Sequence, residues 1–217
     1  MSSRFINGAK YAVSTSLGAA VAITALTNAE PAVATTATPP ADGAVVLLAS
    51  GWTELNESVV RADAPGANAF TLEGIDTADI VRFPAGEGIG AYRTVGGFVS
   101  LSQVRDVATE GGEQNYFTYQ YVEDQGGRQR QKPTFKSPMT TTITLDYDPN
   151  LPWYDTLRDL DRLKGVVVLR ETLPNGDVIF YVGSIAFNGV PSKTINENMT
   201  VVASFSLQAE PIRYAAA

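Results

Sequence analysis

The stretch LPNGDVIFYVGSIAFNG, residues 173–189, decides the fold of this 217-residue chain. Pro-Asn-Gly separates two apolar runs, 166–173 and 178–187, and this composition is typical of the turn of a β-hairpin. In the second run both alternating sets of side chains are largely apolar: Val178, Phe180 and Val182 against Ile179, Tyr181 and Ile185. A strand that is apolar on both faces is covered on both faces. We therefore expect an antiparallel sheet whose second face lies against a helix or a neighbouring subunit.

The same period of two recurs along the whole chain, which is typical of strands. Short runs rich in Val, Thr and Ser alternate with turn segments such as Asn-Glu-Pro and Gly-Gly. The predicted strands are 10–16, 20–27, 32–38, 45–48, 58–62, 69–72, 98–108, 114–122, 140–147, 166–173, 178–187 and 199–208. The predicted fold class is mainly β, an antiparallel sandwich or barrel.

One segment, DPNLPWYDTLRDLDRLKG at 148–165, breaks this pattern. Asp148 or Asn150 offers a helix cap, a proline stands in the first turn, and Gly165 offers a stop. The apolar residues at helical spacing are Trp153, Leu157 and Leu160. The segment predicts a single helix over 152–164 that packs on the sheet.

Composition excludes several kinds of active site. The chain has no Cys and no His, which removes thiol nucleophiles, Ser-His-Asp and Cys-His machinery, and zinc sites built on thiolate or imidazole. The formal charge is −7, from 23 acids and 16 bases, and the acidic surplus is concentrated in residues 42–124. Ordinary binding to the DNA backbone needs a basic surface. The charge does not exclude a surface along which DNA slides without being bound.

Three carboxylates stand three residues apart in FTLEGIDTADI (70–80): Glu73, Asp76 and Asp79. Such a set is either a carboxylate-based hydrolytic site or the acidic rim of a turn, and the absence of an aromatic-rich cleft signature favours the rim. The acids of the predicted helix, Asp155, Asp159 and Asp161, are expected to form its solvated face with Arg partners. We expect no enzyme activity, no cofactor and no metal.

Residues 12–34 have some features of a secretory leader, with Arg4 and Lys10 ahead of an Ala-rich run. Ser and Thr interrupt that run and favour strands. A secreted β-rich adhesin or carbohydrate-binding module stays open as an alternative function. No run reaches the roughly 20 apolar residues of a membrane span.

Two loops carry candidate functional residues. QGGRQRQKPTFK (125–136) lies in a predicted polar loop, 123–138, and its bases either contact DNA, remain solvated or meet another subunit. These bases are Arg128, Arg130, Lys132 and Lys136. GEGIGAY (86–92) lacks the G-x-G-x-x-G of a phosphate loop, and we expect it to be a flexible return between two domains.

The order of elements from 92 to 217 resembles the major tail tube proteins of long-tailed, lambda-like bacteriophages. The residues that carry the resemblance are the hairpin LPNGDVIFYVGSIAFNG, the loop SKTINENM and the closing strand VVASFSLQAEP. It implies a β-sandwich with a packed helix, six copies of which join their sheets into rings that stack into a non-contractile tube. It also implies that the long loop orders against the adjacent ring, so its four bases become candidate inter-ring contacts.

The resemblance further implies a virion structural protein assembled in the host cytoplasm. Its partners would be further copies of itself, the tape measure protein, the tail terminator and the tail-tip proteins, with viral DNA passing through the lumen and no membrane. One face of the last strand region is small and uncharged, and it suits such a lumen: Ser204, Ser206 and Gln208.

Residues 23–77 resemble a small β-barrel module that is inserted in many phage structural proteins. The matching residues are Thr27, Asn28, Ala29, Pro31, Gly43, 53–56 and 70–77. In its second loop Pro-Pro-Ala replaces the usual His-Gly, which affects the shape of the loop. The predicted domains are therefore a discontinuous tube domain, 1–18 with 92–217, and an inserted barrel, 19–91.

Overall fold

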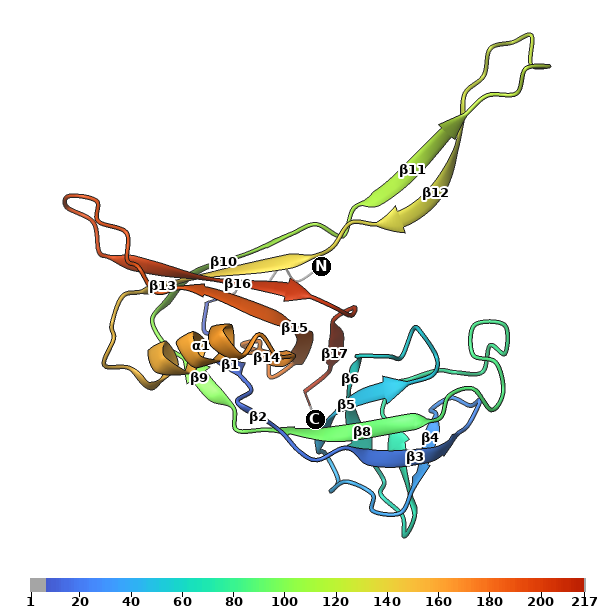
Figure 1. Cartoon of the computed structure of the whole chain (residues 1–217), viewed down its shortest axis with the longest axis horizontal. Coiled ribbons are helices and arrows are strands. Elements are labelled where there is room, and N and C mark those ends of the chain that lie inside the picture. Colours follow the sequence, from blue (N-terminus) through green and yellow to red (C-terminus); the bar gives the residue numbers. More distant parts are fainter. Residues whose placement is uncertain (1–6, 217) are drawn as a thin grey trace.

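The structure, a computed structural model, describes residues 7–216. It comprises a large sheet with one helix, a small closed barrel beside that sheet, and a two-stranded arm that projects from the sheet (Figure 1). This confirms the predicted fold class. Residues 1–6 and 217 of the predicted tube domain lie outside the described residues. In the described part of the chain, no helix has the length and hydrophobicity needed to cross a membrane.

The large sheet has the strand order β10-β13-β16-β15-β14-β1-β9, and β17 pairs with β15 at one end. All these neighbours are antiparallel. Their bounds are β1 Lys10–Val13, β9 Val99–Leu101, β10 Val104–Glu110, β13 Thr140–Asp146, β14 Val167–Thr172, β15 Val178–Asn188, β16 Thr200–Leu207 and β17 Ile212–Tyr214. The hairpin that decides the fold is β14–β15, as its Pro-Asn-Gly turn predicts.

The helix α1 (Pro152–Leu163) covers the inner face of this sheet. Trp153, Leu157 and Leu160 are buried, and they pack in one core with the inward residues of β13 and β16. The predicted caps are wrong in detail. The N-cap is Leu151, without a side-chain hydrogen bond, and the helix ends at Lys164, whose left-handed φ of 49° replaces the expected stop at Gly165.

The barrel closes because β8 pairs with both β3 and β5. The short strand β2 pairs with the last residues of β8, outside the closed ring. Its strands are β2 Ser16–Leu17, β3 Val21–Leu26, β4 Val33–Thr36, β5 Val45–Ser50, β6 Val59–Asp63, β7 Ala69–Leu72 and β8 Gly90–Gly96. The candidate leader segment 12–34 thus supplies the end of β1, β2 and β3, and the beginning of β4. In this structure it is an integral part of both sheets.

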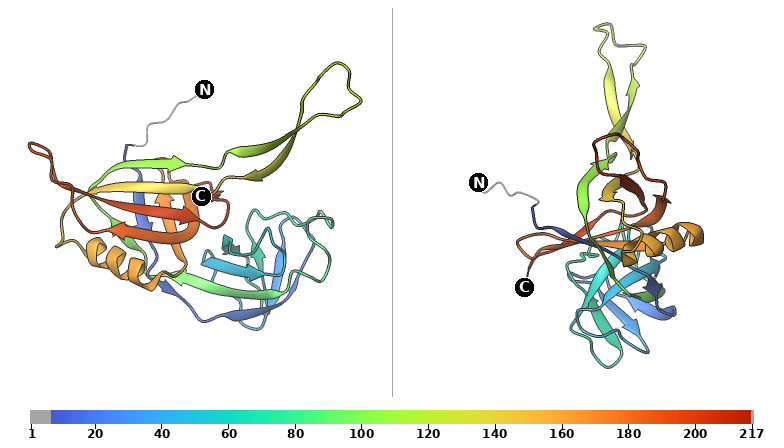
Figure 2. Two further views of the ribbon diagram at one scale, coloured as in Figure 1. Left: turned by 45° about the horizontal axis from the view of Figure 1, so that its top comes forward. Right: turned by 90° about the vertical axis from the view of Figure 1, so that its left-hand side faces the viewer.

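The barrel also covers the outer face of β14 and the first half of β15. Phe180 and Val182 pack there with Val59, Val95 and Tyr214. The expected helix covers one face of β15, and over the first half of this strand the chain's own barrel covers the second face (Figure 2).

Three local predictions differ from the structure. The expected strand 98–108 is divided into β9 and β10, because Gln103 has a positive φ of 60°. The expected loop 123–138 contains the strand β12 (Arg130–Lys136), which pairs with β11 (Gln114–Tyr119) to form the arm. The expected flexible return 86–92 leads directly into β8, a central strand of the barrel.

Candidate assembly surfaces and lumen face

The outer face of the first four strands, β10, β13, β16 and β15, is open and carries small side chains. The register places Thr142 beside Ser204, and Ser204 beside Ala186. The neighbouring rows are similar: Thr140, Ser206 and Ser184 form one, and Thr144, Val202 and Asn188 form the other. The opposite side chains of β16, Val201, Ala203 and Phe205, are buried in the core, as their period of two predicts. We name this open surface the small-residue face.

The charges on the small-residue face are negative and lie along one side. On β10, Asp106 pairs with Thr144 and Glu110 with Thr140, whereas the intervening Ala108 pairs with Thr142. Arg105 lies at the bulge that begins the strand, 3.4 Å from Asp146. The central rows of this face carry hydroxyls and methyl groups and no base that would bind DNA phosphates tightly.

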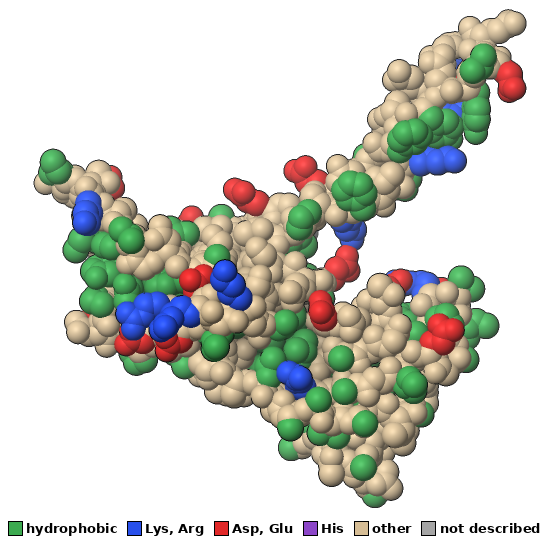
Figure 3. All heavy atoms as spheres, in the orientation of Figure 1, with side chains coloured by type: hydrophobic (Ala, Val, Ile, Leu, Met, Phe, Trp, Pro, Cys, Tyr) green, Lys and Arg blue, Asp and Glu red, His purple; other side chains and the backbone are tan. Residues whose placement is uncertain are grey.

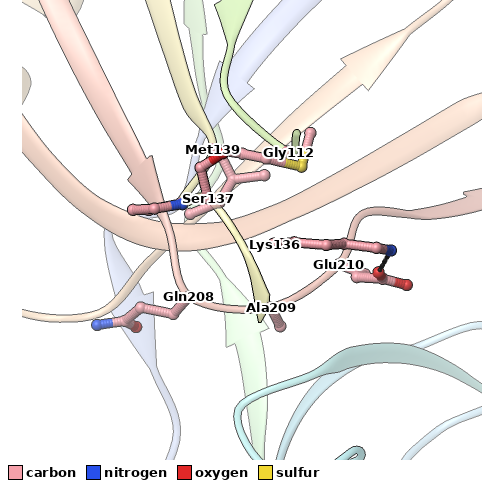
Figure 4. A pocket seen from close by; sticks show the side chains of 9 residues that line it. Gly112, Lys136, Ser137, Met139, Gln208, Ala209 and Glu210 are labelled. Carbon is pink, nitrogen blue, oxygen red and sulfur yellow. Dashed lines mark hydrogen bonds and ion pairs between the residues drawn. The ribbon is translucent and has the colours of Figure 1, made fainter. Parts of the chain in front are cut away.

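Two of the predicted lumen residues, Ser204 and Ser206, lie on the small-residue face. Gln208 follows the end of β16, where its backbone N–H donates to the Val182 carbonyl at 2.8 Å. Its side chain is exposed and extends away from the Lys136–Glu210 pair (Figure 4). The structure therefore places Gln208 at the rim of this surface.

Both lateral edges of these four strands have backbone groups that lack a strand partner within residues 7–216. β10 pairs only with β13, and the ladder between β15 and β14 ends at Gly183, so that residues 184–188 pair only with β16. At this second edge the Phe187 N–H donates to the Asp161 carboxylate at 3.2 Å. Asp161, expected to be a solvated helix residue, caps a strand edge instead, and no local sequence pattern indicates this role. The other helix acids, Asp155 and Asp159, do pair with arginines on the exposed face.

The arm carries three of the four candidate bases away from the body of the subunit. Arg128, Arg130 and Lys132, named the arm bases below, are exposed at its outer part. Hydrophobic and basic side chains alternate along the visible side of the arm (Figure 3). The fourth base, Lys136, lies at the root and forms a 2.7 Å ion pair with Glu210. The spacing of the four bases along the chain does not distinguish them. The structure places three of them on the outer arm and Lys136 at its root.

The root of the arm is a tight backbone contact. Gly111 and Gly112 have φ values of 89° and 77°, and a Cβ at Gly111 would lie 2.0 Å from the Pro138 carbonyl oxygen. A cavity of about 190 Å³ opens beside this contact, between Met139 and the segment that follows β16 (Figure 4). The direction of the arm is therefore set where Gly111 faces Pro138 and Gly112 faces Met139.

The acids that raised the question of a hydrolytic site have structural partners. Glu73 forms a bidentate ion pair with Arg61, which lowers the pKa of the Glu73 carboxyl below its usual range. Asp76 and Asp79 accept backbone N–H groups of their own turn. Residues 7–216 include no group of three or more acids placed to hold a metal ion.

Glu171, on β14, is a buried carboxylate. It accepts the hydroxyls of Tyr11 and Tyr181 at 2.7 and 2.6 Å. Burial, together with the hydrogen bond to this carboxylate, raises the pKa of both tyrosines. Burial and two donors make this cluster a satisfied polar network inside the core.

Comparisons with known proteins show the family of the chain. A chain from a structure titled "Virion of native gene transfer agent (GTA) particle" has a TM-score of 0.41 and 11% identity, over 54% of this chain and 89% of that chain. No curated protein matches the chain. A family model described as phage tail tube protein, TTP, matches residues 50–216. Because that match spans most of the chain, the protein belongs to the phage tail tube protein family.

Proposed function

We propose that this protein is the major tail tube subunit, and that it polymerises into stacked hexameric rings that form the DNA conduit of a non-contractile tail. The observation that carries the proposal is the small-residue face, which is open, without a base along its central rows, and bounded by unpaired strand edges. In this proposal the face lines the lumen, with Ser204 and Ser206 inside and Gln208 at the rim between rings. The role is structural, and we expect no catalysis.

Ring closure follows from the two free edges. If β10 of one copy pairs with residues 184–188 of the next, a continuous sheet forms around the lumen and neither of these two edges remains exposed. In the single subunit the Asp161 carboxylate accepts a hydrogen bond from the Phe187 N–H. It then competes with the incoming strand for this N–H. Such an occupied edge limits pairing with unrelated strands.

Ring stacking is assigned to the arm. Its bases project beyond the body of the subunit, where they meet acids of an adjacent ring, and this complementarity sets orientation more than affinity. Lys136 has a different role in this proposal: its pair with Glu210 holds the root, so it supports the inter-ring contact from within its own subunit.

We also propose that the barrel, residues 19–91, is an insertion into a tube domain formed by 1–18 and 92–217. The support is the pairing of entry with exit: Ser16 lies opposite Gly96 and Leu17 opposite Val95. A segment whose two ends are adjacent can be inserted without distortion of its host. Assembly would take place in the host cytoplasm, around a tape measure protein, with tail terminator and tail-tip proteins at the ends.

Negative-stain microscopy of the purified protein tests this function. Tubes or six-membered rings are expected, and reversal of the three arm bases to Glu should leave folded monomers that do not polymerise. Lys164→Glu, on the exposed end of the helix, is the matched control and should still form tubes. Normal tubes from the triple variant would contradict the stacking role, and a stable monomer with sugar affinity would favour the alternative, a secreted adhesin.

A further inference from the structure

The arm presents an aromatic and cationic face for which its own subunit offers no cover. Phe117 and Tyr119 stack with ring centroids 6.4 Å apart, and Tyr121 follows at 5.4 Å from Tyr119. The register puts Lys132 and Arg130 on this face, where each lies about 5 Å from a ring centroid. A two-stranded hairpin is only marginally stable alone. An exposed face of this composition is typical of a contact with another molecule.

The barrel presents a second unexplained surface, the turn formed by residues 76–82, which we name the barrel turn. Two of its apolar side chains are held in solvent: Ile80 is 66% exposed and Val81 85% exposed. They directly follow Asp79, which stands three residues after Asp76, and both are carboxylates singled out in the sequence. The barrel turn is thus an apolar projection with an acidic rim, and its one base, Arg82, is paired with Glu54.

Buried anchors hold the barrel turn rigidly on both sides. Thr77 is fully buried, and its hydroxyl bonds to the carbonyls of Thr27 and Ala29. Phe83 is buried against Trp52, with ring centroids 5.2 Å apart. The Asn28 side-chain amide bridges the two anchors, donating to the carbonyl of each, at 3.0 and 2.7 Å.

The tip of the barrel turn is fixed as well. The Asp76 carboxylate accepts the Ala78 N–H at 2.8 Å, and the Asp79 carboxylate accepts the Val81 N–H at 2.9 Å. A further backbone bond runs from the Phe83 N–H to the Asp79 carbonyl at 2.8 Å. Apolar side chains displayed on backbone that is already ordered lose little entropy when a partner covers them.

We propose that the barrel turn of one copy is the receptor for the aromatic face of the arm of a second copy. The rings of Phe117 and Tyr119 cover Ile80 and Val81, and the arm bases meet the acidic rim. The charges are complementary, because residues 19–91 contain nine acids and two bases. The inference rests on the proposed assembly into tubes, and it gives the inserted barrel a role in joining subunits.

Contact within one subunit does not satisfy this complementarity. The arm points away from the barrel of its own chain in both orientations, and a hollow separates the two in the space-filling view (Figures 2 and 3). The arm therefore reaches a barrel only in a neighbouring copy.

Disulfide cross-linking tests the contact directly, since the chain has no native cysteine. A mixture of Val81→Cys and Phe117→Cys subunits should give disulfide-linked dimers when oxidised as tubes and none as dilute monomers. The matched control replaces Phe117→Cys with Thr118→Cys, which lies on the opposite face of β11. Absence of the first cross-link in intact tubes, or equal yield from both pairs, overturns the proposal.

Charge exchange gives an independent test that does not depend on oxidation. Asp79→Asn keeps an acceptor for the Val81 N–H but removes the charge, and it should raise the critical concentration for tube formation severalfold. Asp79→Arg and Arg130→Asp should each raise it at least tenfold, and the double variant should recover most of that loss. Asp42→Arg, on another barrel loop, is the control and should change little.

The outcomes separate this inference from the proposed function. Tubes that form normally from Asp79→Arg, with no rescue in the double variant, overturn the receptor role and leave the tube function intact. Wild-type protein that forms neither rings nor tubes overturns the proposed function, and the receptor role with it.

Discussion

Replacement of Tyr214 is expected to uncouple the barrel from the large sheet. This residue lies on β17, which pairs with β15, and its ring is buried with its centroid 6.0 Å from that of Phe180. Its hydroxyl accepts the Arg61 N–H of the barrel at 2.8 Å, and the Arg61 guanidinium lies 4.6 Å from the ring centroid. One side chain therefore contributes packing, a hydrogen bond and a cation–π contact across the junction.

The expected losses differ between two substitutions. Tyr214→Phe keeps the packing and removes the acceptor of a half-buried amide, which costs about 1 kcal/mol. Tyr214→Ala also opens a cavity, and truncation of a buried aromatic side chain costs about 3–5 kcal/mol. With a urea m-value of about 2 kcal/mol/M, the second loss lowers the unfolding midpoint by about 1.5–2.5 M. Tyr121→Ala, on the exposed arm, is the control and should cost less than about 0.5 kcal/mol.

The two tryptophans give each half its own reporter. Trp52 is buried in the barrel core and Trp153 in the core beneath the helix. Urea unfolding is followed by fluorescence in Trp52→Phe and Trp153→Phe backgrounds, at concentrations where the protein is monomeric. The two transitions should coincide with Tyr214 present and separate in Tyr214→Ala. The reasoning is refuted if Tyr214→Ala costs less than 1 kcal/mol, or if both reporters still share one midpoint.

Three further predictions concern the arm root, the fold-deciding hairpin and the lumen. Gly111→Ala places a Cβ at a φ of 89° and 2.0 Å from the Pro138 carbonyl oxygen, so amide exchange at the arm root should accelerate and tube yield should fall; unchanged exchange would contradict the close contact. Hydrogen bonds from Asn175, the Ala216 N–H and Arg213 hold the pKa of Asp177 at about 2, below its ordinary 3.8. The stability that the Asp177 carboxylate contributes is present above pH 3.8 and is lost as the pH falls towards 2. The urea midpoint should therefore fall more steeply over this pH range in the wild type than in Asp177→Asn. Equal slopes in the two proteins would contradict this contribution. Ser204→Lys puts a cation on the small-residue face, so tubes should form but bind DNA at about 50 mM salt and release it at about 200 mM; DNA association indistinguishable from wild type would exclude this face from the lumen.

Local periodicity was sufficient to predict most of the large sheet. In β16 the alternation of Val201, Ala203 and Phe205 with smaller residues is the alternation of buried and open positions. The Pro-Asn-Gly turn and the apolar spacing of the helix are equally local, since each depends on neighbours within a few positions. The apolar side chains on both faces of β15 predict that each face is covered by other parts of the protein or by a partner. They do not show that the chain's own barrel supplies one of these covers, because that contact joins segments far apart in the sequence.

The missed features depend on partners that are remote in sequence. The first position of β8 must be a glycine, because a Cβ at Gly90 would lie 1.9 Å from the Ala49 carbonyl oxygen. This contact leaves no periodic pattern in the sequence. Strand β12 has no buried face, so it lacks the alternation by which strands are predicted. Within the candidate site, Lys136 differs from the arm bases only through Glu210, 74 residues away. Spacing along the chain cannot show which of several exposed bases has a partner.

The distribution of charge between the two parts of the chain links the fold to assembly. Nine acids and two bases lie in residues 19–91, which leaves fourteen acids and fourteen bases in the rest of the chain. The net charge of −7 therefore belongs to the barrel, and the part that carries the small-residue face is neutral overall. Neutral sheets can join without mutual repulsion, while like-charged barrels keep separate molecules apart. Since the Debye length is about 8 Å at physiological salt, in the proposed tube the barrel charge acts on an arm that touches it and not on DNA beyond the sheet.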